Sequence, residues 1–166
     1  MNPVPRWAIY STFILSLVGL AVSIYLTIVH FEPQALSCSS NSLVNCEAVL
    51  NSAQSRIFGI PVAILGLAQY VVLSVINSPW GWNRPQRIVH VARFVMAVIG
   101  LGVILWLVIA EFLIIHKICL YCTGVHFITF AILIILTRVS PVQLGWSRAN
   151  FVDDDAPIPE SETATT

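Results

Sequence analysis

The chain has 166 residues, of which 57% are apolar and 10% are charged. Soluble domains usually carry about 25% charged residues, so the composition excludes an ordinary soluble enzyme. Lysine and arginine balance aspartate and glutamate, eight against eight, and we expect no nucleic-acid partner. The composition predicts an all-α membrane protein surrounded by lipid.

Four apolar runs follow one another along the chain. Each is about long enough to cross a hydrocarbon layer roughly 30 Å thick as a helix. No small-residue cleavage site follows the first run, so we interpret it as a retained helix and not as a signal peptide. The runs predict one domain, residues 1–140, built as a bundle of four transmembrane helices. The predicted spans are residues 7–29, 57–76, 89–115 and 118–136.

Residues 141–166 differ in composition from the rest of the chain. They contain three prolines, three consecutive aspartates at residues 153–155 and a threonine-rich end. Such a segment cannot bury enough apolar surface to offset its loss of conformational entropy. We therefore predict a disordered tail.

Basic residues predict the orientation of the bundle. An even number of spans places both termini on one side, which carries five arginines outside the spans, against two basic residues opposite. The positive-inside rule then predicts that the termini and the tail are cytoplasmic, in a multi-pass protein of the plasma (inner) membrane. We expect Arg93, inside the third span, to snorkel toward the cytoplasmic surface. The five arginines are Arg6, Arg84, Arg87, Arg138 and Arg148, and the two opposite residues are Arg56 and Lys117.

The four cysteines all fall on the predicted extracytoplasmic side. Cys38 and Cys46 bracket a polar loop, and Cys119 and Cys122 form a CxxC motif at the start of the last apolar run. Disulfides form and persist in that compartment. Two cysteine pairs at one membrane surface are suited to passing two electrons as dithiol and disulfide. A redox enzyme is therefore the first hypothesis.

The CxxC motif has a geometry suited to this chemistry. Residues three apart on a helix share a face, so the two sulfurs can meet. The positive end of the helix dipole favours the thiolate form of Cys119, and Lys117 acts in the same direction. The alternative is that Cys119 and Cys122 are small buried residues that pack helices together.

The loop pair and two other polar residues leave alternatives open. Cys38 and Cys46 could form a static structural disulfide, could exchange with the CxxC, or could contribute to a zinc site, for which their spacing is wide. His126 lies four residues after Cys122 and shares its face. Glu111, within the third span, is either a proton site or a side chain near the interface.

An ordered set of residues surrounds the cysteines. Seven residues separate Cys38 from Cys46, Ser52 follows six residues later, and residues 55–61 read Ser-Arg-Ile-Phe-Gly-Ile-Pro. The CxxC stands at the head of the last helix. Over residues 8–138 this set resembles the vitamin K epoxide reductase family, especially its bacterial members.

The resemblance implies a four-helix bundle around a quinone, ubiquinone or menaquinone, with a short extracytoplasmic lid helix between the first two spans. It implies that Cys38 exchanges with a thiol partner and that Cys46 then forms a disulfide with Cys119. Cys122 would face the quinone. The residues that the resemblance places near the quinone are Ser52, Ser55, Phe58 and His126.

Two departures from the animal members bear on the substrate. Ser55 stands where those enzymes have an asparagine, and His126 where they have a tyrosine. Both fit a quinone-reducing bacterial homologue better than an enzyme that reduces vitamin K epoxide. Many bacterial members carry a fused thioredoxin-like domain after a fifth span. The chain has none, so the resemblance implies a separate partner of that type.

The sequence thus predicts a membrane thiol oxidoreductase that reoxidises an extracytoplasmic thioredoxin-like protein and passes electrons to a quinone. Such an enzyme would support disulfide bond formation. Two alternatives remain: a quinone or vitamin K epoxide reductase, and a non-catalytic membrane protein with a structural disulfide.

Overall fold

The structure is a computed structural model that describes residues 4–32, 44–83 and 87–143, with side chains described as far as residue 139. The predicted position of Cys38 and nearly all of the predicted tail lie outside the described residues.

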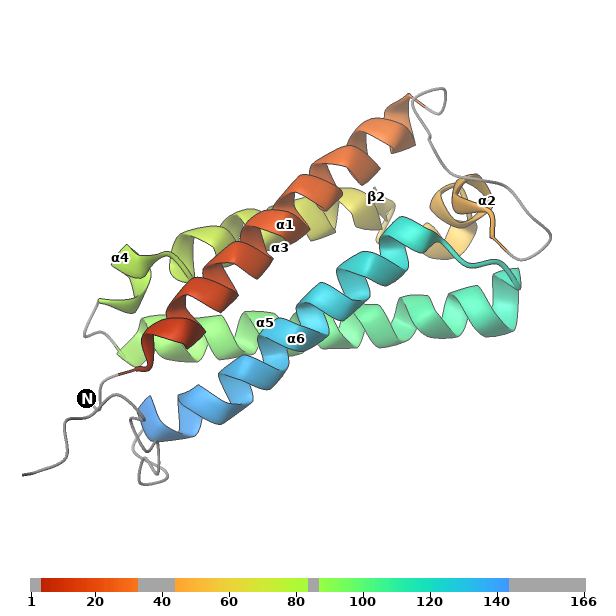
Figure 1. Cartoon of the computed structure of the whole chain (residues 1–166). Coiled ribbons are helices and arrows are strands. Elements are labelled where there is room, and N and C mark those ends of the chain that lie inside the picture. The colour runs from red at the N-terminus through yellow and green to blue at the C-terminus, as the bar shows by residue number, and fades with distance from the viewer. Residues whose placement is uncertain (1–3, 33–43, 84–86, 144–166) are drawn as a thin grey trace, which may run out of the picture.

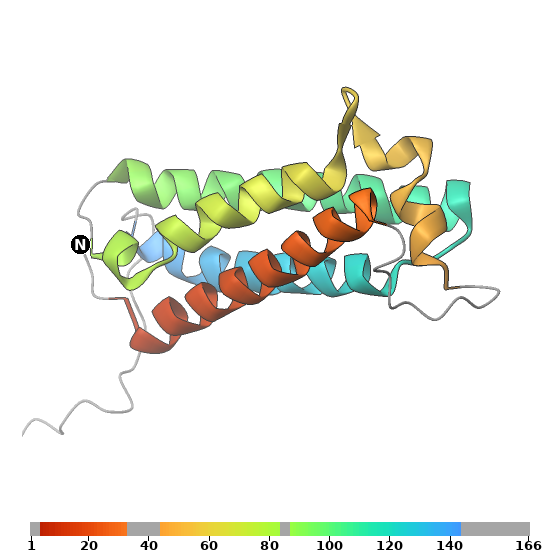
Figure 2. The ribbon, with the colours of Figure 1, turned by 90° about the horizontal axis from the view of Figure 1, so that it is seen from above.

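Four long helices run side by side and form the body of the protein (Figures 1 and 2). Helix α1 packs against α3 and α6, and α5 packs against α3 and α6, so the four surround a common interior. This arrangement agrees with the predicted helical bundle. The four helices are α1 (Arg6–Phe31), α3 (Val62–Ile76), α5 (Arg87–Ile109) and α6 (Leu120–Gln143).

Short elements lie at the two ends of the bundle. Between α1 and α3 come helix α2 (Cys46–Leu50), the 3₁₀ turn η2 (Ala53–Ser55) and a hairpin of strands β1 (Arg56–Ile57) and β2 (Ile60–Pro61). Helix α4 (Pro79–Trp82) lies at the opposite end, near the N-terminus (Figure 1). A π-helical segment, η3 (Ala110–Ile115), continues α5. A short helix therefore occurs where the lid helix was expected.

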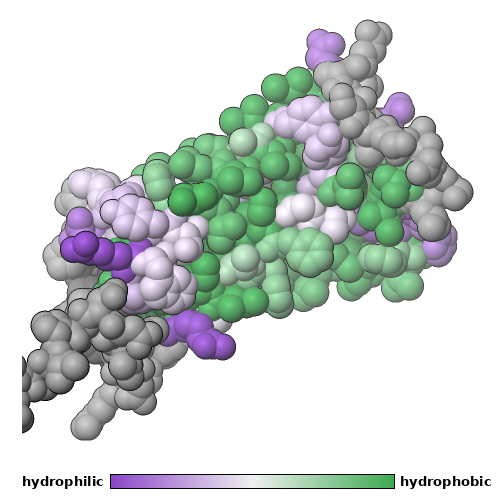
Figure 3. All heavy atoms as spheres, viewed as in Figure 1, coloured by the Kyte–Doolittle hydropathy of each residue, from purple (hydrophilic) through white to green (hydrophobic). Residues whose placement is uncertain are grey.

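The surface of the bundle is that of a membrane protein. Large apolar side chains such as Ile14, Leu105, Leu113 and Phe127 are exposed on the long helices. A broad apolar band covers the middle of the molecule, with polar residues toward both ends (Figure 3). Within the described residues, α1, α6 and α5 together with η3 are long and apolar enough to cross a membrane. Helix α3 is shorter: its 15 residues rise about 22 Å at 1.5 Å per residue.

The second long helix begins later than the apolar run suggests. The predicted span starts at residue 57, whereas α3 starts at Val62. Phe58 and Gly59 have positive φ values of 52° and 81° and form the two-residue turn of the hairpin, a geometry found in type I′ turns. Pro61 then precedes the helix. The predicted start is wrong because Ile57, Phe58 and Ile60 are apolar but belong to a hairpin, which projects from the bundle in Figure 2.

Small residues form the buried face of α1. Thr12 and Ser16 are fully buried, and their hydroxyl groups donate to the carbonyl oxygens one turn earlier, at 2.8 and 2.7 Å. A Cβ on Gly19 would lie 2.0 Å from the ring of Tyr70. Because lipid is as apolar as leucine, helices in membranes associate through such close approach of small residues. The sequence of α1 therefore fixes how closely α3 can pack.

Arg93 lies in the interior of the bundle, contrary to the expectation that it snorkels to the surface. Its side chain is 1% exposed, and its guanidinium stacks 3.6 Å from the ring centroid of Trp82. Nη1 hydrogen-bonds His90 Nδ1 at 3.1 Å, and Nη2 donates to the carbonyl oxygen of Ile76 at the end of α3. The expectation is wrong because these partners, which come from three different elements, hold the guanidinium inside the protein, where only its Nε has no hydrogen-bond partner within the described residues.

Candidate redox site

Cys119 lies immediately before α6, at the position of a helix N-cap. The backbone N–H of Cys122 donates to Cys119 Sγ at 3.3 Å, and the N–H of Thr123 donates to the Cys119 carbonyl at 2.9 Å. The predicted helix start at residue 118 is thus two residues early, and the two sulfurs still meet across one turn. A hydrogen bond from the Cys122 thiol, and to a smaller extent the one from its backbone N–H, lowers the pKa of the Cys119 thiol, although burial opposes the shift. A thiol of this kind is suited to exchange.

Helix α2 lies beside this motif because the backbones pair. Val44 and Ile118 form a parallel β-bridge, and the N–H of Asn45 donates to the carbonyl oxygen of Ile118 at 3.2 Å. Asn45 also caps α2, since its side chain accepts from the N–H of Ala48 at 3.0 Å. Cys46 follows Asn45, and Cys119 follows Ile118. The two cysteines are 1% and 0% exposed and belong to one buried cluster.

The structure gives the redox state of Cys46, Cys119 and Cys122. Cys119 and Cys122 are free thiols, whereas Cys46 is in a disulfide. The partner of Cys46 lies outside the described residues. The resemblance implies a disulfide between Cys46 and Cys119 at one step of electron transfer. This disulfide is not present in the structure, because Cys119 is a free thiol. Cys46 and the free Cys119 nevertheless lie in the same buried cluster.

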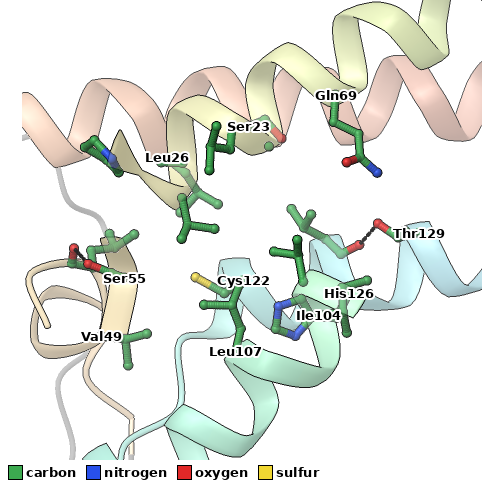
Figure 4. Close-up of a pocket in the computed structure, with 18 of the residues that line it drawn as sticks. Ser23, Leu26, Val49, Ser55, Gln69, Ile104, Leu107, Cys122, His126 and Thr129 are labelled. Carbon is green, nitrogen blue, oxygen red and sulfur yellow. Dashed lines mark hydrogen bonds between the residues drawn. The ribbon is translucent and has the colours of Figure 1, made fainter. Parts of the chain in front are cut away.

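A cavity of about 120 Å³ lies between the four long helices, and Cys122 lines it. In Figure 4 the sulfur of Cys122 points into this cavity. Most of the other lining side chains are apolar, including Leu26 of α1, Ile104 and Leu107 of α5, and Val49 of α2. The volume is comparable to the roughly 150 Å³ apolar cavity that accommodates one benzene molecule. The cavity is therefore of the order of size that holds an aromatic ring.

Several polar side chains also reach the cavity. His126 and Thr129 line it from α6, and Gln69 lines it from α3 (Figure 4). Gln69 Nε2 donates to the Met96 carbonyl at 3.1 Å, and Thr129 Oγ1 is 2.7 Å from the Tyr70 hydroxyl. A few fixed polar groups in an apolar pocket give a ligand its orientation. Cys122 and His126 both line the cavity, so they lie on the same face of α6, as expected from their spacing.

Of the other three residues that were expected near the quinone, Ser55 lines the cavity, whereas Ser52 and Phe58 do not. Ser55 lines the cavity, and its hydroxyl hydrogen-bonds the carbonyl oxygens of Leu50 and Ser52 at 2.7 Å each. Ser52 caps η2, accepting from the N–H of Ser55 at 3.2 Å, and it is not among the lining residues. Phe58 is 100% exposed at the tip of the hairpin. The structure thus brings Ser55 and His126 to the cavity but not Ser52 or Phe58.

Glu111 is a buried carboxylate at the same site. It is 2% exposed, lines the cavity from η3 and accepts a hydrogen bond from the backbone N–H of Cys119. Its Oε1 atom has no hydrogen-bond partner within the described residues. Glu111 acts electrostatically on both thiols of the CxxC motif.

Sequence reasoning missed Gln69, Thr129 and Ser23 as residues of the site. A signal was present, because Gln69 is an amide in an otherwise apolar run, and polar groups within spans usually face the bundle interior. Along α5 and η3, the residues at positions 100, 104, 107 and 111 line the cavity. This 3–4 spacing is that of one helix face.

The chain matches the model of a known protein family. A model of the vitamin K epoxide reductase family matches residues 10–137. No curated protein matches the chain. The matched region includes all four cysteines and every residue of the cavity.

Proposed function

The chain belongs to the vitamin K epoxide reductase family, and from this premise we propose that it reoxidises an extracytoplasmic thioredoxin-like protein and reduces a membrane quinone. The family implies a membrane oxidoreductase that uses quinone-type electron carriers. One observation carries the finer proposal. Cys122 points into an apolar cavity of ring size, while Cys119, its CxxC partner, is buried beside Cys46.

The proposed electron path follows this order. Cys38 exchanges with the protein partner, and the electrons pass through Cys46 to Cys119 and then to Cys122. The backbone pairing of Val44 with Ile118 supports the link between Cys46 and Cys119, because it holds the two segments together. The lowered pKa of the Cys119 thiol supports its role as an attacking group, since the thiolate is the nucleophile in exchange.

The cavity suits a quinone ring, which supplies the two-electron acceptor. Its apolar walls match a lipid-soluble ligand, and His126 provides a polar nitrogen one turn after Cys122 for a quinone oxygen. Helix α2 acts in the proposal as the lid of the cavity, because Val49 and Leu50 line it from that side. The nature of the quinone, ubiquinone or menaquinone, is a question for the assay below.

The proposed topology has four spans with cytoplasmic termini in the plasma membrane. Among the described residues three helices have the required length, and the shorter α3, with 15 residues, would make the fourth crossing. This orientation puts α2 and the CxxC on the extracytoplasmic side, where a thioredoxin-like partner is available. The distribution of arginines supports it.

The test is an assay with purified protein, a quinone and a reduced thioredoxin-like substrate. The wild-type protein is expected to oxidise the substrate in a quinone-dependent way, and Cys119→Ala or Cys122→Ala to abolish this activity. Activity that survives both substitutions would refute a catalytic role for the motif. A parallel reaction with vitamin K epoxide and dithiothreitol separates the two enzyme classes, and faster epoxide reduction would favour the alternative.

A further inference from the structure

We propose that Glu111 carries protons between the CxxC thiols and the quinone, an inference that rests on the proposed function. Oxidation of Cys119 and Cys122 forms one sulfur–sulfur bond and releases two electrons and two protons. Conversion of a quinone to a quinol takes up two electrons and two protons. The reaction therefore balances only if the protons that leave the thiols, or others in their place, reach the quinone oxygens.

The position of Glu111 suits this transfer. It lines the cavity into which Cys122 points, and it accepts a hydrogen bond from the backbone N–H of Cys119. Its charge acts on both thiols. One group thus contacts the thiol motif and the space for the quinone at once, so a proton can be taken up on one side and released on the other.

The surroundings of Glu111 make a purely structural role a poor explanation. A carboxylate within a span is costly to bury and usually has a function. Here one carboxylate oxygen accepts from the backbone N–H of Cys119, whereas Oε1 has no hydrogen-bond partner within the described residues. An unpartnered oxygen at a cavity wall is instead free to bind a proton or a ligand atom.

The local backbone is also unusual at this point. Glu111 lies in the first turn of η3, the π-helical continuation of α5. Single π-helical turns within α-helices are rare and occur frequently at functional sites. Glu111 retains the face of α5 that carries Gly100, Ile104 and Leu107, all of which line the cavity. Among these four residues, Glu111 alone carries a carboxyl group.

In the proposed cycle, the Glu111 carboxylate accepts a proton as a thiol of the CxxC is oxidised. The resulting carboxylic acid donates that proton to an oxygen of the reduced quinone, which returns Glu111 to its starting state, and a second such transfer carries the second proton. The other titratable side chains that line the cavity are His30 of α1 and Cys122 and His126 of α6, and Cys119 contacts Glu111 through its backbone N–H. Helices α2, α3 and α5 contribute no titratable side chain to the lining within the described residues.

The experiment isolates the quinone half of the reaction. The protein is reduced with dithiothreitol, freed of excess reductant and mixed rapidly with ubiquinone-1 or, in parallel, menadione, and quinol formation is followed across roughly pH 5–9. Glu111→Gln keeps the size of the side chain but cannot carry the proton. General acid–base catalysis contributes about 100-fold or more, so we expect a loss of that order in the rate of quinol formation.

Two further readouts separate proton transfer from structure. The pH dependence contributed by Glu111 should vanish in Glu111→Gln, while Glu111→Asp should keep part of the rate with a displaced profile. Reduction of the Cys119–Cys122 disulfide by dithiothreitol involves no quinone and should be little changed. Glu32→Gln, which alters an exposed carboxylate at the end of α1, is the matched control and should behave like the wild type.

Each outcome decides the inference. A wild-type rate and pH profile in Glu111→Gln would overturn it and leave the proposed function intact. Equal losses in the quinone reaction and in disulfide reduction would also overturn it, because they indicate a structural role. If the glutamine variant does not fold, the pH profile of Glu111→Asp decides in its place, and an undisplaced profile contradicts the proposal. A wild-type protein that does not reduce either quinone would refute both proposals together.

Discussion

The backbone N–H of Asn45 donates a hydrogen bond of 3.2 Å to the carbonyl oxygen of Ile118. Each of these residues immediately precedes a cysteine at the start of a helix, Cys46 in one case and Cys119 in the other. The bond therefore holds a disulfide-bonded cysteine and a free thiol in one buried cluster. The exchange proposed between them would therefore begin with both residues already in the same cluster.

This relationship predicts a trapped intermediate in Cys122→Ser. Without the Cys122 thiol, a disulfide between Cys46 and Cys119 cannot be resolved from the CxxC side and should accumulate. Attack by the Cys119 thiolate on Cys46 releases the former partner of Cys46 as a free thiol. Mass spectrometry of non-reduced peptides should find the Cys46–Cys119 cross-link. Its absence from Cys122→Ser, with only the original disulfide present, would contradict the proposed path.

A methyl group on Gly100 should disturb the cavity. A Cβ there would lie 2.3 Å from Gln69 Nε2 and 3.1 Å from Thr129 Cγ2, so Gln69 must leave its place beside the Met96 carbonyl. Overpacking of this kind costs about 1–3 kcal/mol, and Gly100→Ala should raise the KM for quinone. A Cβ on Gly102 meets no atom within 4 Å. Gly102→Ala is thus the matched control, and an equal KM in both variants would argue against this cavity as the quinone site.

The chemistry of His126 predicts a specific effect on quinone binding. His126→Phe keeps a ring at the cavity wall but removes the polar nitrogens. Loss of one hydrogen bond, about 1 kcal/mol, should raise the KM for quinone several-fold and leave disulfide reduction by dithiothreitol unchanged. His126→Tyr restores a hydroxyl group and should recover part of the affinity. Identical quinone kinetics in His126→Phe and the wild type would exclude a contact with the quinone.

Substitution of Arg93 should affect stability and not catalysis. Arg93→Met removes the donor to the Ile76 carbonyl and the cation stacked on Trp82, and an unsatisfied buried acceptor costs about 1–3 kcal/mol. The expected result is a lower thermal midpoint in detergent with normal quinone kinetics, because Arg93, Trp82 and Ile76 do not line the cavity and α4 lies at the end of the bundle away from α2 (Figure 1). Arg138→Met, at an exposed position on α6, is the control. A stable Arg93→Met would show that Trp82 and Ile76 find other partners.

Much of this architecture could be predicted because it depends on local patterns. Apolar runs of sufficient length indicate helices, and the CxxC and His126 share a face by helical spacing alone. The start of α3 could not be predicted in this way. The residues of the hairpin are as apolar as those of a helix, and only the positive φ values of Phe58 and Gly59 distinguish them.

Features that depend on partners far away in the sequence could not be predicted from the sequence either. The burial of Arg93 depends on Trp82, His90 and the end of α3, which no spacing rule brings together. The contribution of Gln69 and Thr129 to the cavity depends on how closely α5 packs against α3 and α6. Gly100 of α5 lies against both side chains, and these partners become apparent only in three dimensions.

The π-helical segment η3 also has a consequence for the length of the chain at this point. A turn closed by hydrogen bonds between residues i and i+5 holds one residue more than an α-turn. A single-residue deletion within 110–115 could therefore be absorbed by the helix as a regular α-turn. The deletion would leave the face of α5 that lines the cavity unchanged up to Leu107. Because the π-turn holds the extra residue, the chain would still leave toward Cys119 in nearly the same direction, whereas the residues within η3 would shift. The position of Glu111 relative to the CxxC therefore depends on the number of residues in η3, and not only on which residues they are.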